Sequence, residues 1–195
     1  MKHIKPVAAG TIALCFATLN AVAGPSQGGG DAPPLADVKT VAGGYMQQLK
    51  STLQEHMKSG GPEAAMGACG EKAAHLGGEV SRQSGWSVKR VSNRARNPLD
   101  MPDAYEQKVL KDFEKKITTT KDDVERYEVV KEGGVRYARY MKAIKIDTVC
   151  LACHGPADKL APEVSAKLRA LYPEDKGVGY NIGQIRGAMT IRKAM

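Results

Sequence analysis

The sequence predicts an α+β protein in which helices pack on an antiparallel sheet. Apolar residues recur every three or four positions between residues 35 and 83, which is the spacing of a helix face. Two later runs, "VERYEVVK" and "VRYARYMKAI", alternate in polarity on either side of Gly133 and Gly134, as the strands of a hairpin do. Helices and strands do not alternate regularly along the chain, which favours an antiparallel sheet.

The first 23 residues are typical of a secretory signal peptide. Two lysines precede an apolar stretch over residues 7–19, and small residues surround an expected cleavage site after Ala23. We therefore expect a periplasmic or otherwise exported protein, with an uncleaved membrane anchor as the alternative. Residues 24–34 are rich in Gly and Pro and are expected to form a flexible linker. No later stretch reaches about 18 apolar residues, so we expect no stable membrane span after cleavage.

Residues 35–195 are expected to form one domain that begins with two long helices. The first helix spans about residues 35–57 and is ended by "KSGGP", and the second begins at Pro62 and runs to about residue 83. Cys69 lies on the apolar face of the second helix, so its side chain is expected to point inward. The other expected elements are a strand in "GWSVKRVS", a helix over 102–117, the hairpin, a short helix over 162–171 and a closing strand in "GAMTIRK".

The composition limits the classes of function. Aromatic residues make up 5% of the chain, so either the core is largely aliphatic or a bound cofactor fills part of it. The formal net charge falls from +8 to +6 when the signal peptide leaves, because Lys2 and Lys5 go and no acidic residue does. The basic residues are spread along the chain with no dense run, which argues against nucleic acid and is compatible with an acidic protein partner.

The stretch "DTVCLACHGP" contains a Cys-x-x-Cys-His motif formed by Cys150, Cys153 and His154. Two thiols at this spacing can each form a thioether to one vinyl group of a haem, and the histidine then lies beneath the iron as an axial ligand. A disulfide or a zinc site are the alternatives, but the sequence has neither the α/β pattern of a thiol oxidoreductase nor a second pair of zinc ligands. We therefore expect one covalently bound haem c.

The second axial position of the iron is less directly indicated. Cys69 is the cysteine that remains once Cys15 has left with the signal peptide and the motif cysteines have bound haem. It could be a small buried hydrophobic residue, but in an exported haem protein we favour a thiolate on the iron, which would lower the reduction potential. The alternative ligands are His56, His75, Met57, Met66, Met101, Met141, Met189 and Met195.

Several motifs together resemble those of a known family. They are "AMGACGEKAAHLGGEV", the following Arg90, Ser92, "RNP" and "PDAYE", and the later "CLACHG" and "GYNIGQIRGAMTIR". From Val38 to Arg192 the chain is similar to a bacterial c-type haem domain family that is catalogued as a domain of unknown function. The resemblance implies a PAS-like fold, with an antiparallel sheet flanked by helices, and one haem whose axial ligands are His154 and Cys69.

Arg94 and Arg96 are further candidates for cofactor binding. A guanidinium group suits a haem propionate because it is permanently charged and can donate two parallel hydrogen bonds. We expect these two loop arginines to contact the propionates, and we expect no catalytic residue.

Together these expectations favour an exported monohaem cytochrome that acts in redox sensing or low-potential electron transfer, with a redox or signalling protein as partner. The alternatives from other classes are a peroxidase-like haem enzyme with an exchangeable distal site, a protein that binds a diatomic gas, and a haem subunit of a larger redox complex.

Overall fold

The computed structural model describes residues 30–67, 70, 72–118 and 122–195. The expected signal peptide, residues 24–29 of the expected linker and Cys69 lie outside these ranges. Residues 30–34 form neither helix nor strand. Within the described ranges, no helix combines the length and the apolar character that a membrane crossing requires.

Four strands form one antiparallel sheet in the order β1-β4-β3-β2. They are β1 (Ser87–Val91), β2 (Glu125–Glu132), β3 (Val135–Lys145) and β4 (Ile185–Ala194). The expected hairpin joins β2 and β3, and Gly133 and Gly134 adopt positive φ in its turn, where other residues would be strained. The predicted α+β class with an antiparallel sheet is confirmed, whereas the PAS-like assignment stays a prediction.

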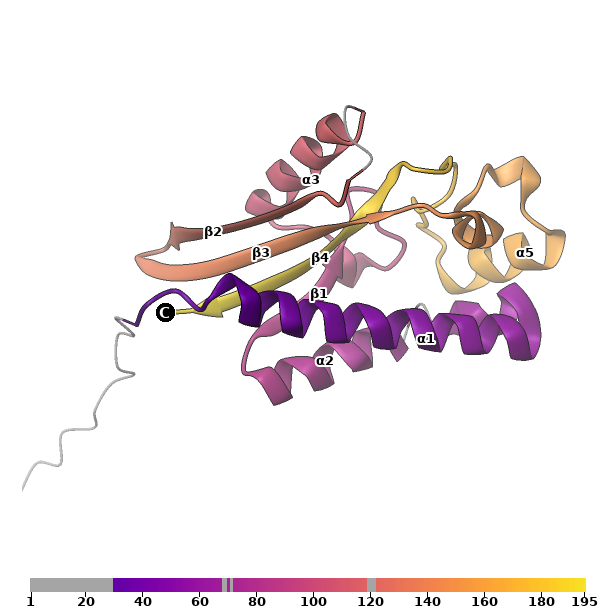
Figure 1. Ribbon diagram of the computed structural model, residues 1–195. Coiled ribbons are helices and arrows are strands. Elements are labelled where there is room, and N and C mark those ends of the chain that lie inside the picture. Colours follow the sequence, from indigo (N-terminus) through magenta and orange to yellow (C-terminus); the bar gives the residue numbers. More distant parts are fainter. Residues whose placement is uncertain (1–29, 68–69, 71, 119–121) are drawn as a thin grey trace, which may run out of the picture.

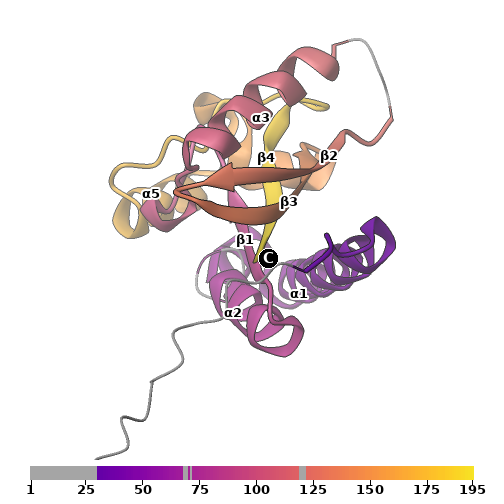
Figure 2. The same cartoon turned by 90° about the vertical axis from the view of Figure 1, so that its left-hand side faces the viewer.

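Helices cover both faces of the sheet (Figures 1 and 2). The long α1 (Leu35–Gly67) and α2 (Ala73–Ser84) lie on one face, and α3 (Ala104–Lys116) lies on the other. The expected break between the first two helices is a kink within α1, where Gly60 and Gly61 have non-helical backbone angles and Pro62 restarts the helix. Apolar residues of α1 and α2 pack on the sheet around Tyr45, Trp86, Tyr140, Met189 and Ile191.

The chain between β3 and β4, residues 146–184, folds into a lobe at one end of the sheet (Figure 1). It contains η3 (Thr148–Cys150), α4 (Leu151–His154), η4 (Ala157–Lys159) and α5 (Pro162–Leu171). Both ends of the lobe are joined, because the Ile146 amide donates to the Gln184 carbonyl and the Gly183 amide donates to the Ile146 carbonyl, each at 2.8 Å. The antiparallel pairing of β3 with β4 therefore holds the lobe at a defined place.

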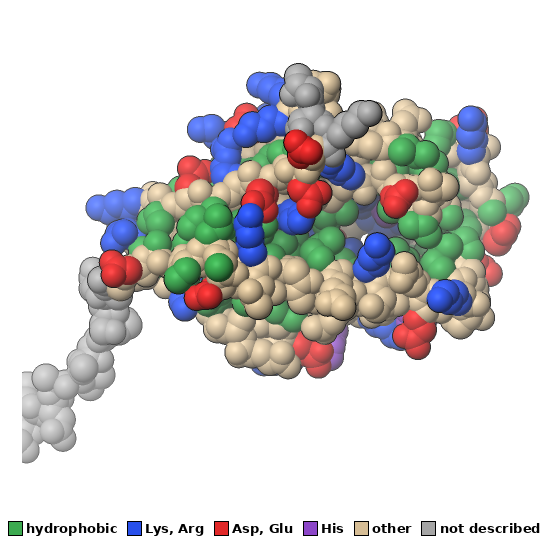
Figure 3. All heavy atoms as spheres, viewed as in Figure 1, with side chains coloured by type: hydrophobic (Ala, Val, Ile, Leu, Met, Phe, Trp, Pro, Cys, Tyr) green, Lys and Arg blue, Asp and Glu red, His purple; other side chains and the backbone are tan. Residues whose placement is uncertain are grey.

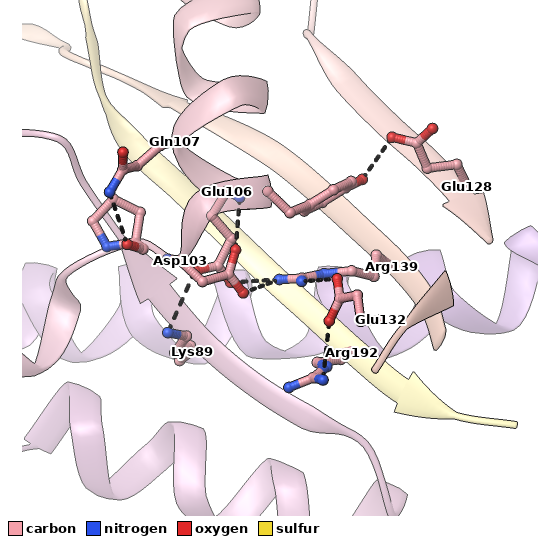
Figure 4. A network of polar contacts seen from close by, with 10 residues as sticks. Lys89, Asp103, Glu106, Gln107, Glu128, Glu132, Arg139 and Arg192 are labelled. Atoms are coloured by element: carbon pink, nitrogen blue, oxygen red, sulfur yellow. Dashed lines mark hydrogen bonds and ion pairs between the residues drawn. The ribbon is translucent and has the colours of Figure 1, made fainter. Parts of the chain in front are cut away.

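A buried ionic network joins the start of α3 to strands β2 and β3 (Figure 4). The Arg139 side chain is 1% exposed and donates to Asp103 at 2.6 Å, Glu132 at 2.6 Å and Glu106 at 3.1 Å. Asp103 and Glu106 also form a capping box at the first turn of α3. A turn of η2 (Pro98–Asp100) precedes this helix.

Replacing Arg139 by methionine is expected to destabilise the protein by about 3 kcal/mol, because the Glu106 carboxylate, 2% exposed, loses its buried partner and keeps the longer, half-exposed Lys89 contact at 3.5 Å. Urea unfolding measures the change. Arg192→Met is the matched control: Arg192 is 39% exposed, pairs with Glu132 and stacks on Tyr137, so about 1 kcal/mol is expected. Adding Glu106→Gln to Arg139→Met should recover part of the loss. An Arg139→Met cost no larger than that of the control would contradict this account of the network.

Candidate functional site

The two motif cysteines lie on consecutive helical turns. Cys150 is the last residue of η3 and Cys153 lies within α4. The helical start is set by Asp147, whose carboxylate accepts a hydrogen bond from the Thr148 amide at 2.6 Å. Residues three apart on a helix share a face, so both sulfurs are presented to one side. The two cysteines do not form a disulfide bond with each other, so both thiols are available for bonding to a cofactor.

His154 ends α4 and its ring is held from one side. The Nδ1 atom donates to the Gly177 carbonyl oxygen at 2.6 Å, since a carbonyl can only accept. The edge of the ring meets the Tyr180 ring at 90°, with centroids 6.5 Å apart. Because Nδ1 holds the proton, Nε2 is the nitrogen with a lone pair. A histidine that donates through one ring nitrogen to a backbone carbonyl is the usual arrangement of a metal ligand.

The surroundings of His154 favour its neutral form. Burial, followed by the nearby guanidinium groups of Arg186 and Arg96, lowers the pKa of His154 well below its usual value. The imidazole is therefore neutral at pH 7. Metal binding requires a neutral imidazole, so no proton has to be displaced from Nε2 before a metal can bind there.

A short segment that we call the strap, residues 175–180, crosses over His154. The Gly179 amide donates to the Gly155 carbonyl at 2.7 Å, and the Tyr180 amide donates to the His154 carbonyl at 2.9 Å. Gly179 has φ +78°, a conformation that favours glycine. The strap thus binds the end of α4 through its backbone as well as through the His154 ring.

Arg96 and Asp175 anchor the strap. Arg96 Nε donates to the Asp175 carboxylate at 2.9 Å, and both side chains are about one tenth exposed. The other oxygen of Asp175 accepts from the Gly177 amide at 2.6 Å. Arg96 also donates to the Cys153 carbonyl at 2.6 Å. One arginine therefore links the motif helix to the strap.

Arg94 also binds the strap. Its side chain donates to the carbonyls of Lys176 and Val178, and its guanidinium stacks on the Tyr180 ring 4.0 Å from the centroid. The structure brings Arg94 and Arg96 to the predicted site, where their donors contact protein groups. Contact of either arginine with a haem propionate stays a prediction.

Arg186 is a residue of this site that sequence reasoning missed. It is the second residue of β4, and its Nε lies 3.2 Å from His154 Nδ1. Its guanidinium also donates to Ser92 Oγ at 2.8 Å and to the Arg94 carbonyl at 3.1 Å. Burial lowers the pKa of Arg186, but an arginine stays protonated at neutral pH. The available signal was an arginine directly before the apolar run "GAMTI" of a buried strand.

Apolar side chains of α1 and α5 pack beside the motif. Met66, Val164 and Leu168 form a buried cluster against which Cys153 and Tyr172 pack. On the face seen in Figure 3, hydrophobic side chains also gather in a hollow above α1. The motif residues therefore border an apolar environment on one side and a cationic one on the other, a combination that suits an apolar cofactor with acidic substituents.

The candidates for the second axial ligand separate into groups. Cys69 itself lies outside the described residues. Two residues near it in the sequence lie beside the motif lobe: Met66 is in the cluster next to Cys153, and Gly70 is so close to the Tyr172 hydroxyl that a Cβ there would clash. His56 accepts a hydrogen bond from Lys72 Nζ at 2.8 Å, and it lines a groove between α1 and α2 together with the exposed His75. No described residue of the lobe lines that groove. Among the other methionines, Met141 and Met189 lie in the sheet core and Met101 is half-exposed.

Comparisons with known proteins agree on one relationship. A family model described as Tll0287-like matches residues 33–193. The crystal structure of the cyanobacterial haem protein Tll0287 superposes with a TM-score of 0.62 at 22% sequence identity, covering 84% of this chain and 98% of that one. At this identity the superposition shows a shared fold. No curated protein matches the chain.

Asp175→Asn is expected to destabilise the protein by about 3 kcal/mol, because the Arg96 charge loses its nearly buried partner. Urea unfolding measures the loss. Hydrogen exchange should show faster exchange of the Gly179 and Tyr180 amides, which bond to the end of α4. Asp158→Asn, at an exposed position of the same lobe, is the control and should change stability by less than about 0.5 kcal/mol. Unchanged exchange at both amides in Asp175→Asn would show that the ion pair does not hold the strap.

Proposed function

The chain belongs to the Tll0287-like family, and from this membership and the geometry around His154 we propose that it is an exported monohaem c-type cytochrome. Its role on this proposal is redox sensing or low-potential electron transfer. The observation that carries the proposal is the arrangement of His154, whose Nδ1 donates to the Gly177 carbonyl and leaves Nε2 available, directly after two cysteines on one helical face.

Haem, when bound, supplies an iron centre that accepts and releases one electron. Cys150 and Cys153 would hold it covalently, each thiol adding its sulfur to one carbon and its hydrogen to the other carbon of one vinyl group. The addition consumes no oxidant, but it requires both cysteines as thiols. The absence of a disulfide between the two described cysteines supports this role. Export agrees with it as well, because free thiols outside the cytoplasm tend to be oxidised unless they are used.

The Cys69 thiolate is the ligand that we propose on the other side of the iron. Two described neighbours of Cys69 in the sequence support it. Met66 packs in the cluster that contains Cys153, and Gly70 packs against Tyr172 at the end of α5. A thiolate stabilises the ferric state through its negative charge, so this ligand lowers the reduction potential.

The remaining parts of the proposal concern location and partners. Cleavage of residues 1–23 would release a periplasmic protein with a net charge of +6, which suits docking to an acidic redox or signalling protein. A PAS-like fold agrees with the described sheet, which has helices on both faces.

Covalent attachment is tested by the mass of the denatured protein after export in cells that mature c-type cytochromes. The parent should have the mass of the chain plus one haem, and the Cys150→Ala/Cys153→Ala variant should have the mass of the chain alone. Cys69→Ala should keep the haem and change the ferric absorption spectrum, because a thiolate is lost. Met66→Leu, which alters a neighbouring buried side chain, should leave the spectrum unchanged. A parent protein without covalent haem would refute the proposal. An unchanged spectrum in Cys69→Ala would show that Cys69 is not the second ligand and would favour Met66 or His56.

A titration of the reduced protein with carbon monoxide tests whether the haem can sense a gas. We expect carbon monoxide to displace the thiolate, because reduction removes one positive charge from the iron and weakens its bond to an anionic ligand. The visible spectrum should then change to that of a carbon monoxide adduct, as a sensor requires. A spectrum unaffected by saturating gas would exclude gas sensing and leave redox sensing or electron transfer as the role.

A further inference from the structure

Arg186 lies next to the nitrogen of His154 that does not bind metal. Its Nε is 3.2 Å from His154 Nδ1, and its guanidinium lies 5.6 Å from the centroid of the Tyr180 ring that also flanks the histidine. Nδ1 already donates to Gly177, so it has no lone pair to accept from Arg186. The arginine is therefore present as a neighbouring positive charge more than as a hydrogen-bond partner of the ring.

The position of this charge is fixed by a closed set of hydrogen bonds. Arg186 donates to Ser92 Oγ at 2.8 Å and to the Arg94 carbonyl at 3.1 Å. The Ser92 hydroxyl donates back to the Arg186 carbonyl at 2.7 Å, and the Ser92 side chain is buried. These bonds join the end of β1 to the start of β4, so the guanidinium cannot move away without breaking the contacts of two strands.

The charge of Arg186 is felt by two described carboxylates, Asp100 and Asp175, but these pair with Arg90 and Arg96. Within the described part of the chain, neither Arg186 nor the adjacent Arg94 forms an ion pair with a carboxylate. Asp175, the nearest acidic residue of the strap, is paired with Arg96. A partly buried cation whose nearest carboxylates are paired with other arginines is costly, so Arg186 is a candidate for a role at the group it faces.

Two influences therefore act on His154 in opposite directions. The Gly177 carbonyl draws the Nδ1 proton toward itself and makes Nε2 a stronger electron donor, which favours ferric iron. The permanent charge of Arg186 opposes this, because positive charge near the ligand disfavours the more positive ferric state. The balance between these two influences helps to set the reduction potential of a haem that is ligated by His154 and Cys69.

We propose that Arg186 is a positioning residue that holds its charge against His154 and so raises the reduction potential of the haem. The proposal rests on His154 being the axial ligand, as put forward above. Arg186, at the start of β4, would then help to set the reduction potential, whereas the two motif cysteines would attach the cofactor.

The test is a redox titration of the haem-loaded protein, followed by its visible spectrum. Arg186→Gln keeps a hydrogen-bonding side chain for Ser92 but removes the charge, and it should lower the equilibrium constant for reduction about tenfold, which is about 59 mV for one electron. Arg186→Lys keeps the charge and should remain within about threefold of the parent. Arg192→Gln removes a charge from the other end of β4 and should leave the potential unchanged.

The outcomes are distinguishable from failure of the proposed function. A parent protein without haem, or one whose spectrum survives His154→Ala, refutes the ligand assignment and this inference with it. A loaded parent whose potential is unchanged in Arg186→Gln overturns the role of Arg186 alone. An equal fall in Arg186→Lys and Arg186→Gln would also overturn it, because the effect would then come from altered packing and not from charge. Urea unfolding of the three variants measures that packing directly.

Discussion

The hydrogen bond from His154 Nδ1 to the Gly177 carbonyl is the interaction on which the site depends. It decides which ring nitrogen is available, and it fixes the direction in which that nitrogen points. The strap that supplies the carbonyl is itself bound to α4 through the Gly179 and Tyr180 amides. His154, the strap and the motif helix therefore behave as one unit, and the neutral state of the imidazole follows from its burial among guanidinium groups.

The fold supports this unit from two directions. Adjacent antiparallel strands β3 and β4 bring both ends of the lobe to one end of the sheet. The kinked end of α1 packs against α5 and Cys153 from the other side. The Arg139 network lies elsewhere, between α3 and the sheet, and stabilises the sheet without touching the lobe (Figure 4). The Arg139 network thus stabilises the sheet, whereas the Arg96–Asp175 pair arranges the site.

Local patterns were sufficient to predict the elements and the motif. Helical spacing predicted α5 at residues 162–171, and the Gly60–Pro62 break was expected from "KSGGP". The Cys-x-x-Cys-His spacing predicts covalent haem attachment, and the structure places both cysteines on one helical face. These features were accessible because each depends on residues within a few positions of one another.

The support of His154 could not be predicted in the same way. Arg96 and Asp175 are 79 residues apart, and Arg186 reaches Ser92 across 94 positions. Most acceptors in the strap are backbone carbonyls, which leave no mark on the sequence. The charge of Arg94 and Arg96 predicts contacts with haem propionates, and the structure gives both of them hydrogen bonds to the strap. Residues 92–96 and 175–186 form one site only because β1 and β4 are neighbours in the sheet.

We propose that His154 and the Cys69 thiolate bind the iron, and the proposed low reduction potential depends on this pair. The electron paramagnetic resonance spectrum of the oxidised parent protein tests it most directly, because low-spin ferric haem with a thiolate ligand has a recognisable signature. The account predicts that signature in the untreated protein. A high-spin ferric spectrum, or a low-spin spectrum typical of two nitrogen ligands or of histidine with methionine, would contradict it.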